Sequence, residues 1–353
     1  MKRFLNVLVL FCLPFVLFFV YGMFGYEKSG GDLNRLGKIS ISEHYRDTLL
    51  ANDTLPKLWT NFSEIDRNLE KGPIDVLIIG DSFSNQGTIS YYNFLASIIT
   101  LNVFNFDYNA FNLGDYYNPI QLLFGIKNSG LIEEIKPKCI VLEIVERNVI
   151  EHFRNLDHNL QIDKAELKDR LYSPVIEPLA FPVRTFFNDI VLYYRYGFFY
   201  KFNDHAYESQ VYKLAMSDTL FSSGIDDLIF FEKDLINMHN TITEQNIELF
   251  NDGMNMLNKE LESIGINLIV LVCPDKYDMY QDYIVNNRHP KNPFFDILRS
   301  KNKTYDFIDT KTLFMPYLEK GIKDLYFADD THWSPIASKI VAQELNKVIG
   351  QNE

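Results

Sequence analysis

The sequence predicts an α/β fold: a doubly wound parallel sheet between helices, with an N-terminal transmembrane helix and an aromatic-rich insertion. Three observations lead to this prediction. Short apolar runs rich in β-branched residues alternate with helical segments, which is the pattern of parallel strands joined by helices. The alternation breaks down between about 150 and 240, where aromatic residues accumulate. A long run without charges precedes the whole pattern.

The clearest predicted strands are 74–79, which ends at Gly80, and 139–145, which Lys136 and Pro137 introduce. Each is a short run with several Ile and Val residues, as expected for strands buried on both faces. The other predicted strands are 102–106, 266–272 and 305–308, and the predicted helices are 91–101, 120–126, 244–264 and 336–349. Strands and helices therefore alternate on both sides of the insertion.

The predicted organisation is a membrane anchor or signal segment at 1–26, a linker and approach helix at 27–70, and one α/β domain at 71–349. The insertion at about 150–240 carries aromatic clusters such as Tyr193-Tyr194 and Phe198-Phe199-Tyr200. A segment of this kind builds a wall over a substrate site or packs the core of a helical subdomain. Both interpretations stay open.

Lys2 and Arg3 precede the charge-free run at 4–26. As a helix rising about 1.5 Å per residue, this run is long enough to cross a hydrocarbon core about 30 Å thick. The positive-inside rule keeps Lys2 and Arg3 in the cytoplasm and places the rest of the chain outside it. A cleaved signal peptide is the alternative, but the bulky residues 21–26 offer no small-residue cleavage site, which favours an uncleaved anchor.

The composition excludes several classes of protein. With 353 residues, 47% hydrophobic and 23% charged, the chain is globular and can build a large core. A formal net charge of −13 disfavours nucleic acid as a partner. Cys139 and Cys273 lie in predicted strands and are expected to be buried, so no disulfide framework is predicted.

Ser82 is the candidate nucleophile. It follows Gly80-Asp81 at the carboxyl end of the first strong strand and precedes a predicted helix, where open α/β sheets bind their ligands. A serine on such a turn supplies a nucleophile and a backbone oxyanion donor together. The alternative is an ordinary turn in which Ser82 or Ser84 caps a helix. Asp81 is expected to stabilise the turn through its own backbone contacts and to take no part in catalysis.

A second cluster, Asp329-Asp330-Thr331-His332, precedes the closing helix. A carboxylate close to a histidine can hold its Nδ1–H and leave Nε2 to take a proton from a serine that the fold brings near. An acidic surface loop followed by a helix start at Pro335 is the alternative. The catalytic interpretation of this cluster is strengthened because the cluster lies near the end of the same predicted domain that has Ser82 near its start.

Other chemistries lack their motifs. The chain contains neither Gly-x-x-x-x-Gly-Lys-Ser/Thr nor Gly-x-Gly-x-x-Gly, and its other histidines form no His-Glu-x-x-His pair. No metal and no nucleotide cofactor are predicted.

Gly80-Asp-Ser-Phe83 and Asp329-Asp-Thr-His-Trp333 together resemble the first and last signature blocks of the SGNH hydrolase superfamily. The chain is most similar to its alginate O-acetyltransferase-like or "DHHW" branch, with further support from 135–147 and from 274–280. This resemblance covers most of 74–349, leaves out the insertion, and implies a flavodoxin-like sheet.

The resemblance implies that Ser82 is the nucleophile, His332 the general base, and Asp329 or Asp330 the carboxylate that orients it. The Asp-x-x-His spacing of the superfamily selects Asp329, and the Asp-x-His spacing of the alginate-type enzymes selects Asp330. We slightly favour Asp329.

The chain departs from the superfamily in the block that follows the third strand, where Gly-x-Asn-Asp is replaced by Glu143-Ile-Val-Glu-Arg-Asn148. Arg147 or Asn148 is a candidate for the missing oxyanion donor, and 105–114 can supply a backbone N–H. A salt bridge of Arg147 to Glu143 or Glu146 is equally compatible with the sequence. Lys276 is a candidate contact for an anionic or sugar substrate, or else forms a surface pair with Asp275 or Asp278.

These features predict a bacterial, single-pass inner-membrane protein whose extracytoplasmic domain moves acetyl groups onto hydroxyls of a cell-envelope or exported polysaccharide through an acyl-serine. The resemblance implies a membrane-bound O-acyltransferase partner that supplies the acetyl group. A carbohydrate acetyl esterase with the same triad is one alternative. A non-catalytic glycan-binding or assembly protein on an SGNH scaffold is the other.

Overall fold

In the described part of the chain, the five predicted strands and one unpredicted edge strand, β1, form a parallel sheet in the order β1-β3-β2-β4-β7-β8. The computed structural model describes residues 1–351 apart from 52, 54, 65–73, 107–117 and 173–185. β4 lies inside the sheet, with β2 on one side and β7 on the other. The strands are β1 (Thr60–Asn61), β2 (Val76–Ile79), β3 (Val103–Asn105), β4 (Cys139–Val145), β7 (Asn267–Cys273) and β8 (Asp306–Asp309).

Helices cover both faces of the sheet, because successive side chains of each strand point to opposite sides. In β2, Val76 and Ile78 enter one core cluster, and Leu77 and Ile79 enter the other. The first cluster includes residues of α4 (Tyr91–Ile98), α14 (Thr310–Glu319) and α15 (Pro335–Gln351). The second includes residues of α5 (Pro119–Asn128), α6 (Ile132–Ile135), α7 (Glu146–Arg154), α11 (Glu244–Glu262) and α13 (Phe294–Ser300). The predicted α/β class is confirmed.

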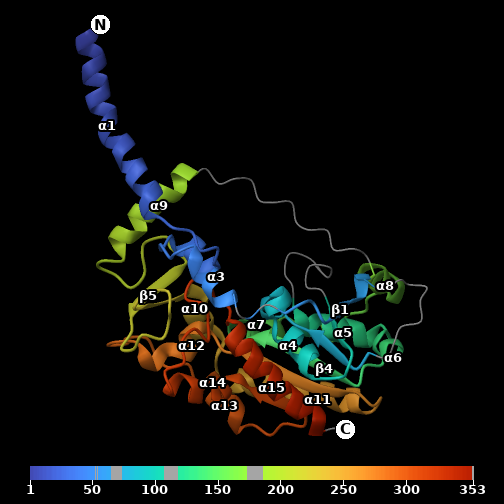
Figure 1. Cartoon of the computed structure of the whole chain (residues 1–353). Helices are drawn as coiled ribbons and strands as arrows, with labels where there is room; N and C mark the ends of the chain where they lie inside the picture. Colours follow the sequence, from blue (N-terminus) through green and yellow to red (C-terminus); the bar gives the residue numbers. More distant parts are fainter. Residues whose placement is uncertain (52, 54, 65–73, 107–117, 173–185, 352–353) are drawn as a thin grey trace.

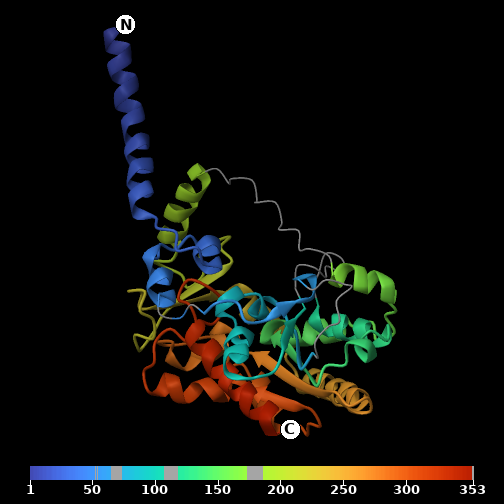
Figure 2. The same ribbon diagram turned by 45° about the vertical axis from the view of Figure 1, so that its right-hand side comes forward.

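The N-terminal run forms α1 (Lys2–Gly25), which projects away from the globular part of the molecule (Figures 1 and 2). Gly22 is its one buried residue. The helix is long and apolar enough to cross a membrane, a property that it shares with signal sequences.

Part of the segment expected to be a linker is built into the domain. β1 pairs with β3 as an edge strand. α2 (Asp32–Gly37) is joined by hydrogen bonds to the loop before α15, where the backbone N–H groups of Leu33 and Asn34 both donate to the Asp329 carbonyl. Gly31 approaches the same carbonyl so closely that a Cβ would collide with it. The chain therefore returns to the C-terminal part of the domain directly after α1.

The insertion is more regular than the sequence indicated. It contains α8 (Lys164–Leu171), α9 (Phe186–Phe199), β5 (Val211–Ala215), β6 (Asp227–Phe231) and α10 (Glu232–Thr241). β5 and β6 form an antiparallel hairpin that the sequence analysis did not identify. Aromatic pairs hold it to the domain, since Tyr212 stacks on Phe230 at 5.2 Å and Phe230 packs 5.1 Å from Tyr277. These aromatic residues therefore pack a subdomain core.

Candidate active site

Gly80 and Asp81 turn the chain from the end of β2 into the short 3-10 helix η2 (Ser82–Ser84). A Cβ at position 80 would collide with the side chains of Ser84 and Glu143, so this close approach requires glycine. The Asp81 carboxylate accepts hydrogen bonds from the backbone N–H of Phe83 at 3.1 Å and of Val145 at 2.8 Å. As predicted, Asp81 stabilises the turn, and it also ties the turn to the end of β4.

Glu143 supports this turn from beneath. Its side chain is fully buried and accepts hydrogen bonds from the backbone N–H of Asp81 at 3.0 Å, from Ser84 Oγ at 2.8 Å and from Cys273 Sγ at 3.1 Å. Burial, reinforced by the nearby Asp81 carboxylate, raises the pKa of Glu143 well above its usual value. The carboxyl group links β2, β4 and β7 where these strands end.

His332 is oriented by Asp330. The Oδ1 atom of Asp330 lies 2.5 Å from Nδ1 of His332 and accepts the His332 backbone N–H at 3.1 Å. Asp329, which we slightly favoured, is fully buried and points elsewhere, accepting hydrogen bonds from Gly31 N at 3.1 Å and Arg46 Nε at 2.8 Å. The preference for Asp329 was wrong, because the turn folds the carboxylate two residues before His332 back onto its ring.

The charges of this pair reinforce each other. Burial alone would lower the pKa of His332. The adjacent Asp330 carboxylate raises this pKa and outweighs burial, so the net pKa lies above the usual value. Burial likewise opposes charge on Asp330, yet His332 and Arg46 together hold the pKa of that carboxyl far below its usual range. The site therefore favours an ionised Asp330 beside a strongly basic imidazole.

The fold brings the serine and histidine clusters together. The Phe83 ring, next to Ser82, lies 4.7 Å from the His332 ring and 5.0 Å from the Trp333 ring between centroids. Gln86 also donates a hydrogen bond to the Trp333 carbonyl at 3.0 Å. Among the described residues, Nε2 of His332 has no partner and no hydrogen bond joins it to Ser82 Oγ. Catalytic hydrogen bonds of free enzymes are often long and tighten only with substrate.

The segment that follows α1, residues 27–50, contributes residues that the sequence analysis did not single out. The Asp32 carboxylate accepts hydrogen bonds from the backbone N–H and hydroxyl of Thr331 at 2.8 and 2.6 Å. The Arg46 guanidinium binds Asp329 and Asp330 together and lies over the Phe327 ring. No motif or local spacing marks these contacts, because about 285–300 residues separate the partners.

Lys276 holds the same loop from the opposite side. It is fully buried, and its ammonium donates to the carbonyls of Phe327 at 2.7 Å, Ala328 at 2.8 Å and Asp330 at 3.1 Å. Burial lowers the pKa of Lys276 to about 8, against the influence of Asp329 and other carboxylates. Both expectations for this residue were wrong, since it has no exposed surface for a substrate and its ammonium binds carbonyl oxygens.

Arg147 and Asn148 lie in the first turn of α7, which starts at Glu146 directly after β4. It forms ion pairs with Asp275 at 2.7 Å and with Asp234 at 3.4 Å between Nη1 and the carboxylate oxygens. The sequence-based alternative of a bridge to Glu143 or Glu146 was wrong in its partners, because those side chains face other donors. Asn148 is half-buried. Most of 105–114, the other expected oxyanion segment, lies outside the described residues.

One group could also offer ligands to a metal ion. Potential ligand atoms of Asp32, Asp330 and His332 lie within 4.8 Å of one another. However, Thr331 already donates to Asp32, and Arg46 to Asp330. A cation here would have to compete with both, so the donor set fits a proton-transfer site better than a metal site.

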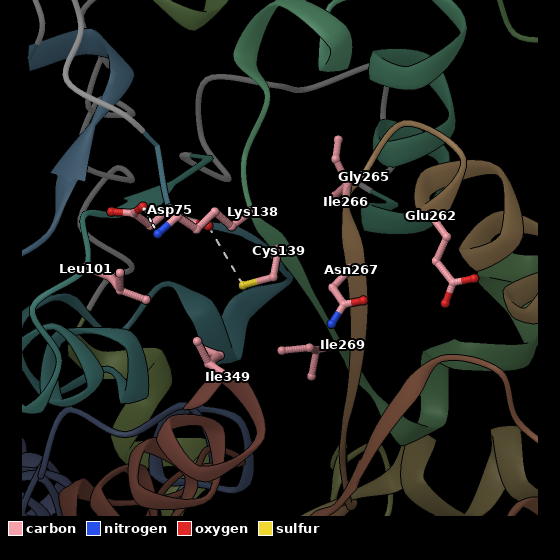
Figure 3. A pocket seen from close by; sticks show the side chains of 10 residues that line it. All are labelled: Asp75, Leu101, Lys138, Cys139, Glu262, Gly265, Ile266, Asn267, Ile269 and Ile349. Carbon is pink, nitrogen blue, oxygen red and sulfur yellow. Dashed lines mark hydrogen bonds and ion pairs between the residues drawn. The ribbon is translucent and has the colours of Figure 1, made fainter. Parts of the chain in front are cut away.

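A cavity in the described part of the chain lies at the other end of the sheet. It has a volume of about 700 Å³ and is walled by residues around the start of β4 and β7 (Figure 3). Its lining is mainly apolar, with Asp75 and Lys138 paired at 3.1 Å on one side. Ser82 and His332 do not line it, and ligands of open α/β sheets bind at the carboxyl ends of strands.

Comparison with protein families agrees with this geometry. Residues 222–353 match the SGNH hydrolase-like domain of the acetyltransferase AlgX. The predicted family resemblance is confirmed over these residues. The matched part of the chain contains His332, Asp330 and Lys276, whereas Ser82 and Arg147 precede it. A search of curated proteins gives no significant match.

The orienting role of Asp330 predicts how the pH profile changes. His332 must be neutral to accept a proton, and Asp330 raises its pKa. In Asp330→Asn the acid limb of kcat/KM for ester cleavage should move to lower pH, and kcat should fall by about 10²–10⁴-fold. Asp329→Asn is the matched control and should retain the wild-type acid limb. A larger loss in Asp329→Asn, or an unmoved limb in Asp330→Asn, would contradict this assignment.

The position of Lys276 predicts a stability effect. Lys276→Met leaves three loop carbonyls without their donor and should lower the free energy of unfolding by about 3 kcal/mol. Urea unfolding of the detergent-solubilised chain, followed by circular dichroism, measures this change. Lys291→Met removes an exposed lysine with one surface ion pair and should have almost no effect. Equal stability of the two variants would show that Lys276 does not hold the loop.

Proposed function

We propose that this chain is a membrane-anchored, extracytoplasmic O-acyltransferase that transfers acetyl groups to hydroxyls of a cell-envelope or exported polysaccharide. The observation that carries the proposal is the Asp330–His332 pair. The Nε2 atom of its imidazole has no partner among the described residues, and the ring packs beside the residue after Ser82. An oriented base beside a serine turn is the arrangement of nucleophilic acyl transfer.

In the proposed reaction, Ser82 Oγ attacks the carbonyl carbon of the acetyl donor while Nε2 of His332 takes the hydroxyl proton. Asp330 stabilises the imidazolium that forms. His332 then returns this proton to the leaving group of the donor as the acyl-serine is completed. A sugar hydroxyl next attacks the acyl-serine, with His332 accepting its proton and passing it to the departing Ser82 oxygen.

The oxyanion of each tetrahedral intermediate needs positive or hydrogen-bonding groups. We assign the backbone N–H of Ser82 at the start of η2 as one donor, with Arg147 and Asn148 as candidates for the other. Arg147 follows the end of β4, which the Val145–Asp81 hydrogen bond ties to the serine turn, and this supports a place for the guanidinium near the site. Its ion pairs with Asp234 and Asp275 would hold it in position.

Contacts at the end of α1 support an anchor that stays on the protein. Gly22 is buried under Ile190 and Tyr194, and Tyr26 stacks on Tyr193 at 5.1 Å between ring centroids. Removal of α1 would expose these partners in α9. With Lys2 and Arg3 in the cytoplasm, the domain lies outside the bacterial inner membrane. A membrane-bound O-acyltransferase is the proposed source of the acetyl group.

An acetyl esterase with the same residues is the second candidate. Ser82 is partly exposed, so water as well as a sugar hydroxyl can reach an acyl-serine. The two activities differ only in the acceptor that resolves this intermediate.

The catalytic assignment predicts the result of removing either reacting side chain. Ser82→Ala and His332→Ala should each lower acetyl turnover by about 10³-fold or more, because each removes part of one proton-transfer unit. Exposed residues provide matched controls, Ser263→Ala and His44→Ala, which should retain activity. The assay incubates the full chain in detergent with a chromogenic acetyl ester and candidate oligosaccharides, and follows ester cleavage and glycan mass together.

Ser82-dependent cleavage with an acetyl gain on the sugar supports a transferase. Cleavage without that gain, across acceptors of different chemistry, supports the esterase and contradicts transfer. Absence of cleavage in a folded wild-type chain contradicts the catalytic proposal.

A further inference from the structure

Helix α9 of the insertion packs against the end of α1. The two helices lie side by side in both views of the molecule (Figures 1 and 2). Ile190 and Tyr194 cover Gly22, and the Tyr194 ring lies 4.0 Å from the Phe18 ring between centroids. The contact joins two segments that are far apart in sequence, so α9 shares whatever environment surrounds the last turns of α1.

The depth of this contact follows from the length of α1. About 20 helical residues span a hydrocarbon core about 30 Å thick, so a span that starts at Phe4 reaches about residue 24. Phe18 then lies inside the hydrocarbon region. The hydroxyl of Tyr194 donates to the Phe18 carbonyl at 3.0 Å, and the Tyr194 ring must therefore lie at the depth of the lipids. This hydrogen bond satisfies the hydroxyl group where no water is at hand.

Apolar side chains continue from Tyr194 along one face of α9. Val191, Tyr194 and Phe198 follow at spacings of three and four residues, which places them in one stripe of the helical surface, and Phe202 lies in the turn after the helix. Val191, Phe198 and Phe202 are 46%, 59% and 71% exposed. Phe198 and Phe202 also pack together, at 5.3 Å between ring centroids. Water is a poor solvent for a continuous apolar stripe of this kind.

We propose that this stripe inserts into the outer leaflet of the bilayer beside α1, so that α9 is a second membrane-contacting element. The inference rests on the proposed anchoring of α1. Aromatic side chains are favoured at membrane interfaces, where their rings contact the lipids and the hydroxyl groups of tyrosines bind polar partners. The exposed Lys201 at the end of the helix is suited to the phosphate groups of the lipids.

A second contact with the membrane, through α9, would fix the orientation of the domain relative to the bilayer. A single flexible connection after α1 would not. Asp189 of α9 binds Lys28 and the buried Lys38 at 2.8 Å each. These lysines flank α2, whose Asp32 holds Thr331 beside His332. The lipid-held helix pair is thus joined through ionic contacts to the loop of the candidate active site, which sets the site at a fixed height above the membrane.

Tryptophan fluorescence tests the proposal in the full chain, reconstituted in phosphatidylcholine vesicles with and without brominated acyl chains. Val191→Trp and Phe198→Trp place a probe on the stripe, and both positions are exposed, so the fold should tolerate them. Leu249→Trp is the matched control, 52% exposed on α11 on the far side of the domain. Phe11→Trp, in the middle of α1, reports on anchoring. The native Trp59 and Trp333 are buried and give a constant background.

Quenching of the Val191→Trp and Phe198→Trp probes severalfold above that of Leu249→Trp supports the proposal. Quenching of Phe11→Trp alone overturns it while leaving the anchor intact, and means that the stripe binds a protein or remains in water. Absence of quenching in Phe11→Trp overturns the anchoring itself and this inference with it.

Discussion

The candidate site depends on the neutralisation of two adjacent buried carboxylates. Asp329 is fully buried and Asp330 nearly so, and burying a carboxylate without a partner is costly. Arg46 supplies that cation to both, and its planar guanidinium suits a pair of carboxylates better than an ammonium group would. Asp330 is then free to hold His332 with its other oxygen. The base of the proposed reaction is therefore held in place by a residue from the segment that follows α1.

A related constraint shapes the serine side of the site. The carboxyl ends of β2, β4 and β7 carry several buried acids, and each is matched by a donor from a neighbouring strand or turn. Asp81 accepts from the end of β4, and Glu143 accepts from the turn and from Cys273. Arg147 is held by Asp234 and Asp275, which come from the insertion and from the end of β7. The insertion therefore contributes to the site through charge as well as packing.

Much of the fold could be predicted because its signals are local. The predicted strand at 139–145 has the same bounds as β4. A short run rich in β-branched residues, buried on both faces, is easy to recognise in a sequence. The hairpin of β5 and β6 was not identified, because its aromatic residues gave no clear period of two. The roles of Arg46, Asp32 and Lys276 depend on contacts across the whole chain, which no spacing reveals. The choice between Asp329 and Asp330 depended on one turn, and family spacing alone did not decide it.

The central claim is that Ser82 carries the acyl group, and peptide mapping tests it most directly. The full chain is incubated with a chromogenic acetyl ester, quenched with acid during turnover, digested and analysed by mass spectrometry. The account predicts one acetyl group on Ser82 in the wild type and a strongly reduced amount in a chain whose His332 is replaced by alanine. Continued turnover with an unmodified Ser82, or acetyl attached to a different residue in proportion to turnover, would contradict it.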